Sequence, residues 1–172
     1  VDFANYAKRL TIKDAGNKIT TSGAALGTFN NITHAPDIVS LLFVQNGVNL
    51  YDIPKTSQAA SEALIFYTAF AMGNSNIWDS TLDQSMLAFA KGNLAMYIGY
   101  ARDIPEIRSQ NPTLNMSVIP IPHVAGIEEE LNKTIASYWA EGVSTKSLYQ
   151  KEAFELLKFM SEKDNLEKIY NE

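Results

Sequence analysis

The chain has 172 residues, of which 46% are hydrophobic and 19% are charged, a composition that can bury one or two ordinary cores. A net charge of -5 without a Lys/Arg-rich run gives no basic surface for nucleic acid or an anionic membrane. The absence of cysteine excludes disulfides, thiolate metal sites and a cysteine nucleophile. No stretch reaches the roughly 18 to 20 apolar residues of a membrane span.

The first half of the chain predicts three helices. Asp2 to Leu10 has apolar residues at helical spacing, and glycines and Asp14-Ala15-Gly16-Asn17 favour a loop over residues 11–27, with one short strand near Ile19. Pro36-Asp37 opens a second helix, Ile38 to Gln45. The third helix, Lys55 to Met72, has a continuous apolar stripe and ends at a glycine.

The second half predicts shorter elements. A helix capped by Asp79 ends at Lys91-Gly92 and is followed by a buried strand, Leu94 to Gly99. The further elements expected in chain order are a helix from Pro105 to Arg108, strands at Met116–Ile121 and Thr134–Tyr138, a helix at Lys151–Met160 and helical pattern at Leu166–Tyr170. Since helical pattern reaches both ends, we expect the chain to be an internal piece of a longer protein.

Motifs of common enzymes are missing, because the sequence has neither a G-x-S-x-G elbow nor a phosphate-binding loop. His34 and His123 lack chelating spacing, which favours structural roles over metal ligation. Asp79 and Asp83 would share a helix face as a glycosidase-like pair, although helix capping by Asp79 is the simpler interpretation. The acidic run 128–130 is expected to be a solvated loop, with weak calcium binding as the alternative. We expect no metal and no cofactor.

Aromatic and amide side chains gather where elements give way to loops, at Phe29-Asn30-Asn31, at Tyr97, at Gly99 to Arg102 and at Ser137 to Trp139. Sugar sites need a flat apolar surface for the ring and planar donors and acceptors for the hydroxyls. These residue types therefore suit binding without reaction, although packing in the core is the alternative at each position.

One segment carries a family resemblance. Phe89-Ala90-Lys91-Gly92-Asn93-Leu94-Ala95-Met96 resembles the F-x-x-G-x-x-A-M signature of family 1 extracellular solute-binding proteins, the maltose-binding-protein-like components of ABC importers. The order of the later segments is also similar to that family: Val118 to Pro122, Tyr138 to Val143 and Ala153 to Met160. The resemblance implies a helix-rich α/β fold, one lobe of a type II periplasmic-binding-protein fold with a few short strands.

The same resemblance implies a division of the chain and a ligand site. Residues 1–118 would form the second lobe, 119–123 a hinge crossover, and 124–172 a segment that packs with a first lobe absent from this chain. Tyr100 would contact the ligand, with Gly99 allowing close approach and a helix starting near Arg102 directing its positive end at the cleft. The other ligand-contacting residues implied are Trp139, its neighbour Tyr138, and Asn31.

These observations predict capture of a small polar solute, most simply a sugar, and its delivery to an ABC permease without catalysis. The resemblance implies an extracellular or periplasmic location, with membrane anchoring as a lipoprotein in the full-length protein. Two alternatives stay open: a glycoside-processing enzyme that uses Asp79, Asp83 or Asp103, and a scaffold or adhesion domain without a small ligand.

Overall fold

The computed structural model describes residues 2–123, 133–138 and 140–170. The chain divides into two compact units, which we call unit 1 (Val1–Ile135) and unit 2 (Ala136–Glu172). The sequence placed the change of lobe at residues 119–123, whereas the division between the units falls after Ile135. The assignment of the units to lobes stays a prediction.

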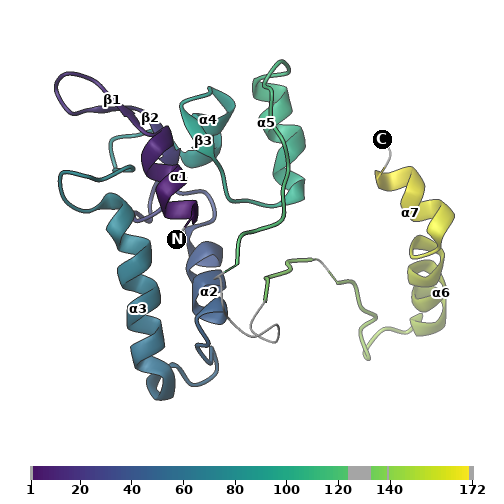
Figure 1. The fold of residues 1–172 in the computed structure, drawn as a ribbon. Coiled ribbons are helices and arrows are strands. Elements are labelled where there is room, and N and C mark those ends of the chain that lie inside the picture. The colour runs from purple at the N-terminus through teal and green to yellow at the C-terminus, as the bar shows by residue number, and fades with distance from the viewer. Residues whose placement is uncertain (1, 124–132, 139, 171–172) are drawn as a thin grey trace. The chain divides into compact units, whose positions relative to one another are not determined.

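A small sheet organises unit 1 (Figure 1). Its strands are β1 (Ile12–Lys13), β2 (Ile19–Ala24) and β3 (Leu94–Met96), in the order β1-β2-β3. β1 runs antiparallel to β2, and β3 runs parallel to it with Ser22 opposite Leu94. The strand expected near Ile19 is confirmed, and the expected strand 94–99 is shorter because sheet pairing ends at Met96.

Helix α1 (Asp2–Leu10) packs directly on β2. A Cβ on Gly23 would lie only 1.8 Å from the carbonyl oxygen of Ala7, so this strand position accepts no side chain. Thr11 fixes the same contact, because its hydroxyl donates to the Ala7 carbonyl at 2.8 Å and accepts from the Gly23 N–H at 2.9 Å. Helix and strand therefore meet backbone to backbone.

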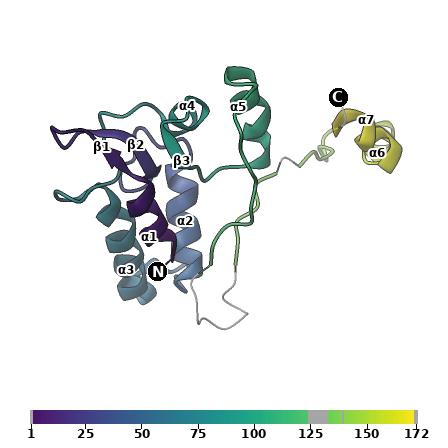
Figure 2. The ribbon, with the colours of Figure 1, turned by 45° about the horizontal axis from the view of Figure 1, so that its top comes forward.

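Helices α2 (Ala35–Gln45) and α3 (Ser57–Thr68) run side by side in unit 1 (Figures 1 and 2). Short 3₁₀ turns, η1 (Ile53–Thr56) and η2 (Ala69–Ala71), flank α3. The expected helices 38–45 and 55–72 are thereby confirmed, with the second divided at both ends into tighter turns.

The core of unit 1 lies between these helices and the sheet. Trp78 is fully buried at its centre, and its indole N–H donates to Thr28 Oγ1 at 3.0 Å and to Asn31 Oδ1 at 3.2 Å. The surrounding buried side chains are Leu26, Ile32, Ile38, Tyr67, Phe70, Ile77 and Leu94. Because the buried indole N–H is hydrogen-bonded, these bonds offset the cost of removing it from water.

The region between α3 and the sheet corrects one expectation. Asp79 does not cap a helix; its Oδ1 accepts from the backbone N–H of Thr81 at 2.8 Å, which closes a local turn. Helix α4 begins only at Ser85 and ends at Ala90. After β3, the 3₁₀ turn η3 (Ala101–Asp103) leads into α5 (Ile104–Gln110), as the proline at 105 predicted.

Two expected strands are wrong. Residues 116–121 and 134–138 have no regular structure, although both segments are rich in β-branched and aromatic residues. Pro120 cannot donate a ladder hydrogen bond, and Val118 and Ile119 are 73% and 74% exposed. An extended apolar segment is a strand only where a neighbouring strand pairs with it. The acidic run 128–130 lies outside the described residues.

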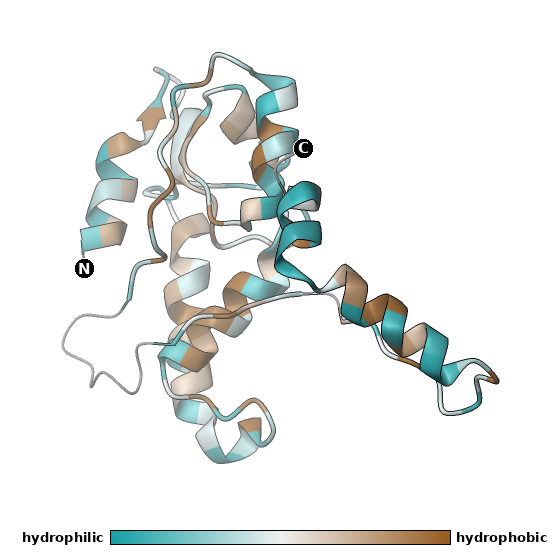
Figure 3. Cartoon of the chain, turned by 90° about the vertical axis from the view of Figure 1, so that its right-hand side faces the viewer, coloured by the Kyte–Doolittle hydropathy of each residue, from teal (hydrophilic) through white to brown (hydrophobic). Residues whose placement is uncertain are grey.

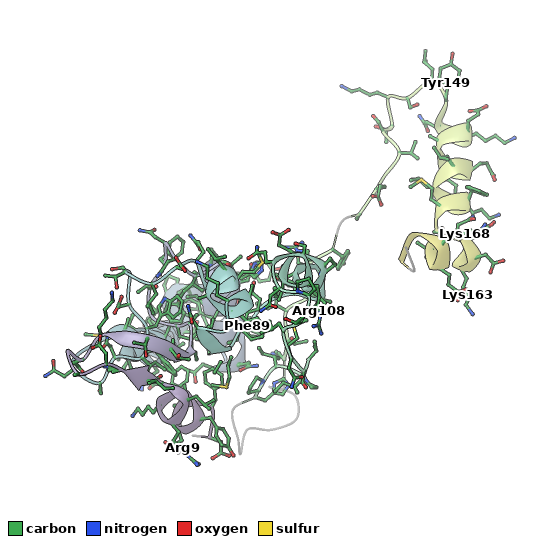
Figure 4. All side chains as sticks on the ribbon, turned by 90° about the horizontal axis from the view of Figure 1, so that it is seen from above. Arg9, Phe89, Arg108, Tyr149, Lys163 and Lys168 are labelled. Atoms are coloured by element: carbon green, nitrogen blue, oxygen red, sulfur yellow. The ribbon has the colours of Figure 1, made fainter. Side chains whose placement is uncertain are left out.

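Unit 2 contains helices α6 (Gln150–Met160) and α7 (Lys163–Tyr170). Figure 3 shows hydrophobic and hydrophilic bands alternating on α6, and Figure 4 places Tyr149 at its start and Lys163 and Lys168 on α7. No residue of α6 is buried in the structure. The predicted helix 151–160 is confirmed.

Candidate functional site

The loop after β3, which the sequence favoured for ligand binding, folds around one buried carboxylate. Asp103 is 8% exposed. Its Oδ2 accepts hydrogen bonds from the backbone N–H of Tyr100 and from the hydroxyl of Tyr97, both at 2.9 Å. Because an ionised carboxylate only accepts, both donors hold the loop around Asp103.

A third group reaches the same oxygen from the residue that precedes α2. His34 Nε2 lies 2.7 Å from Asp103 Oδ2, and the other ring nitrogen lies 3.8 Å from Asp37 Oδ2. The imidazole also meets the Tyr100 ring edge to face, with 4.9 Å between the ring centroids. We call this set of residues the His34 cluster: His34, Asp37, Tyr97, Tyr100, Arg102 and Asp103.

Protonation in the His34 cluster follows from burial and hydrogen bonding. Burial alone would raise the pKa of Asp103, but the hydrogen bonds from Tyr100, His34 and Tyr97 together hold this pKa below its ordinary value. Burial, and then the Asp103 carboxylate, raises the pKa of Tyr97 far above its usual range. Burial and the neighbouring Asp37 also raise the pKa of Tyr100. At neutral pH the carboxylate is therefore ionised and both phenols can donate.

Tyr100 and Arg102 form the solvent-facing part of the cluster. Tyr100 is half-buried and Arg102 is exposed. The guanidinium carbon of Arg102 lies 4.6 Å from the centroid of the Tyr100 ring, a distance typical of a cation–π contact. The pair presents an aromatic ring and a planar set of donors at one place.

Packing within the loop itself requires a glycine at position 99. A Cβ at this position would lie 2.3 Å from Tyr97 Cε1 and 2.4 Å from Asp103 Oδ2. The loop can close around the carboxylate only because residue 99 has no side chain. Close approach of a ligand to Gly99 stays a prediction.

Asn31 lies in the interior of unit 1 and is 8% exposed. Its amide nitrogen donates to the carbonyls of Asp79 at 2.9 Å and Leu82 at 3.1 Å, while its oxygen accepts from Trp78. These contacts tie the loop before α2 to the segment before α4. Ligand contact by Asn31 stays a prediction and would compete with these bonds.

The structure brings Gly99, Tyr100 and Arg102 together but does not relate them to the second predicted aromatic pair. Tyr138 belongs to unit 2 and is 82% exposed. Trp139 lies outside the described residues. Their participation in a common site stays a prediction.

The carboxylates of the enzyme alternative have separate surroundings. Since α4 begins at Ser85, the helix face that Asp79 and Asp83 were expected to share does not exist. Asp83 pairs with Lys91 at 2.8 Å on the surface, whereas Asp103 faces His34 in the His34 cluster. None of these contacts joins two of the three carboxylates.

The sequence named Tyr97 among its aromatic candidates but did not indicate His34 and Asp37 as members of the site. His34 and Asp37 are three residues apart at the start of α2, a spacing that places both on the same side of a first helical turn. This spacing is the feature of the sequence that could have indicated a contact between the two side chains. The pairing of His34 with Asp103, 69 positions away, could not be inferred from spacing.

A separate cavity of about 420 Å³ lies within unit 1. Its wall is mostly apolar and comes from α1, α2, α3 and residues 121–123. At its edge the buried amide nitrogen of Gln45 lies 3.2 Å from each of three acceptors: the Pro122 carbonyl, His123 Nδ1 and the Lys133 carbonyl. The Gln45 side chain, at the end of α2, therefore contacts two segments of the chain, residues 122–123 and residue 133.

Two kinds of feature are not found within the described ranges. None of the helices there is both long and apolar enough to cross a membrane. Among the same residues, no group of three or more His, Asp or Glu side chains is arranged to hold a metal ion.

The comparisons with known proteins identify the class of protein. The family model for bacterial extracellular solute-binding proteins matches residues 2–171. The chain therefore belongs to the bacterial extracellular solute-binding protein family, and its helix-rich α/β fold is the predicted fold of one lobe of a periplasmic-binding protein. No curated protein and no solved structure matched the chain.

Proposed function

We propose that this chain belongs to a two-lobed protein that captures a small polar solute, a sugar or oligosaccharide, and delivers it to an ABC-type permease without catalysis. The family supplies the general role, extracellular solute binding. The observation that supports the site is the Tyr100–Arg102 contact, held by a buried carboxylate on the loop after β3.

The charges around Tyr100 support a neutral, hydroxyl-rich ligand. Arg102 contributes a positive charge at the ring, and Asp37, whose side chain is 49% exposed, contributes a negative one. The second carboxylate, Asp103, is buried and already contacts three groups of the cluster, so Arg102 and Asp37 are the charges that face a ligand. The guanidinium provides hydrogen-bond donors, the carboxylate provides acceptors, and the aromatic ring provides an apolar face. The two opposite charges balance each other. This balance favours a sugar over a polyamine or an anionic solute.

The proposal includes the lobe arrangement that the family resemblance implies. Residues 1–118 would form the second lobe, 119–123 a hinge crossover, and 124–172 a segment that packs with the first lobe. The exposed apolar side chains of α6 support a partner surface for unit 2. Closure of the lobes on the solute would create the form that the permease recognises, and lipoprotein anchoring would keep the protein at the membrane.

Thermal shift on the intact protein tests this function. We expect a mono- or oligosaccharide to raise the melting temperature, because a ligand at 100 times its Kd stabilises by about 2.7 kcal/mol. Tyr100→Ala should abolish the shift. Tyr51→Ala is the matched control, because Tyr51 is a fully exposed tyrosine of unit 1.

Two outcomes would overturn the proposal. Folded protein that responds to no sugar, polyol, amino acid or polyamine would favour a scaffold role. Release of product from a glycoside, lost on changing Asp79, Asp83 or Asp103 to Asn, would establish the enzyme instead.

A further inference from the structure

We infer that His34 and Asp103 are positioning residues, which hold Tyr100 and Arg102 in the binding-competent arrangement before a ligand arrives. The inference rests on the proposed function in assigning ligand contact to Tyr100. The positioning itself is a property of the ligand-free protein and can be measured without any ligand.

The first support is the convergence of three contacts on one oxygen. Asp103 Oδ2 lies 2.9 Å from the Tyr100 backbone nitrogen, 2.9 Å from the Tyr97 hydroxyl and 2.7 Å from His34 Nε2. The side chain of Asp103 is 10% exposed. Water therefore has little access to replace a lost partner, and each contact restricts the loop.

The second support is that His34 contacts Tyr100 by two routes. Through Asp103 it acts on the backbone of Tyr100, and through its own ring it packs against the Tyr100 side chain at an interplanar angle of 83°. His34 forms no side-chain cap on α2. Its polar contacts are with the two carboxylates of the cluster, so helix capping does not account for its place.

The third support is a series of contacts that leads from His34 to the protein surface. The Tyr100 ring, fixed on one side by His34, carries the guanidinium of Arg102 at 4.6 Å. The groups that face His34 are Asp37 from α2 and Tyr97, Tyr100 and Asp103 from the loop. Loosening of His34 or Asp103 thus reaches both ligand-contacting side chains.

Preorganisation predicts a defined effect on affinity. When only a fraction of the protein has the competent arrangement, the apparent Kd rises by the inverse of that fraction. A loop that is competent one tenth of the time would bind about tenfold more weakly, even with every contacting residue unchanged.

The test combines two substitutions of His34 that separate donor from ring. His34→Gln retains a donor that can reach Asp103, and His34→Phe retains a ring against Tyr100 but removes the donor. We expect His34→Phe to weaken sugar binding about tenfold and His34→Gln to recover most of the affinity. Asp103→Asn should weaken binding similarly, and the surface variant Asp83→Asn is its control.

The decisive readout is fluorine NMR of ligand-free protein labelled with 3-fluorotyrosine, with the Tyr100 resonance assigned by its loss in Tyr100→Phe. We expect one sharp resonance in the parent protein and in Asp83→Asn, and a shifted or broadened one in His34→Phe and Asp103→Asn. An unchanged Tyr100 resonance in folded Asp103→Asn would overturn the inference. If His34→Phe fails to fold, the Tyr100 resonances of His34→Gln and Asp103→Asn still test the inference.

These measurements separate the two proposals. A Tyr100 resonance that responds as expected, in a protein that binds no solute, would retain the positioning role and refute the function. Sugar binding with an affinity unaffected by Asp103→Asn would retain the function and refute the positioning role.

Discussion

Units 1 and 2 contain equally regular helices but bury very different amounts of apolar surface. Unit 1 encloses Trp78 completely, together with Leu26 and Ala7. In unit 2, the α6 side chains of Phe154 and Phe159 are 64% and 58% exposed. Helical periodicity is thus present in both units, whereas among the described residues every buried hydrophobic side chain lies in unit 1.

The comparison shows what helical periodicity does and does not specify. The apolar stripe of α6 predicted its helix correctly, but such a stripe becomes a stabilising face only where another element covers it. An isolated helix of about this length is marginal in water. The stability of unit 2 should therefore depend on a partner surface far more than that of unit 1.

The largest expected effect contrasts Trp78→Ala with Phe159→Ala. Removing the buried indole should lower the free energy of unfolding by about 3 to 5 kcal/mol, whereas truncating the exposed ring should change it by about 0.5 kcal/mol or less. Urea titration of both variants provides the values. A large loss in Phe159→Ala would show that a partner already covers α6, and the contrast between the units would disappear.

A second contrast uses two glycines. Gly23→Ala should destabilise unit 1 by about 1 to 3 kcal/mol, because the new methyl group would overlap the Ala7 carbonyl of α1. Around Gly142 in unit 2, no described atom lies within 4 Å of the corresponding position, so Gly142→Ala should be neutral within about 0.5 kcal/mol. Chemical denaturation measures both, and equal effects would contradict the backbone contact between α1 and β2.

The smallest expected effect concerns pH. Since the folded-state pKa of Asp103 lies below its ordinary value, this residue contributes stability above the unfolded-state pKa, and the contribution is lost as pH falls through the folded-state pKa. We expect a loss on the order of 1 kcal/mol. Urea titrations from pH 7 to acid should show a smaller decrease for Asp103→Asn than for the parent protein, and an identical decrease would exclude Asp103 as the source.

Most helices and the strands near Ile19 and Leu94 could be predicted from the sequence, because their signals are local. The Lys55–Met72 stripe, the proline before Ile38 and the glycine after Met72 act within a few residues. The expected strands 116–121 and 134–138 failed because pairing depends on a distant neighbour that the structure does not provide. The helix expected from Asp79 failed because its carboxylate closes a turn instead.

The candidate site was predictable only where its residues are adjacent in the chain. Tyr100, Gly99 and Arg102 follow the signature segment directly, so the resemblance could assign them together. His34 contacts Asp103 across 69 positions, and only the packing of α2 against the loop after β3 joins them. Local patterns therefore grouped the residues that we propose contact the ligand, but not the residues that support them.

Helix α2 has polar anchors at both ends, with His34 immediately before it and Gln45 as its last residue. Eleven residues of α-helix span about 16 Å, and a helix this short behaves as a rigid rod. This rod therefore joins the contacts of His34 at one end to the Pro122 and Lys133 carbonyls at the other. Residues 122–123 and 133 are thereby fixed to the same helix that follows His34.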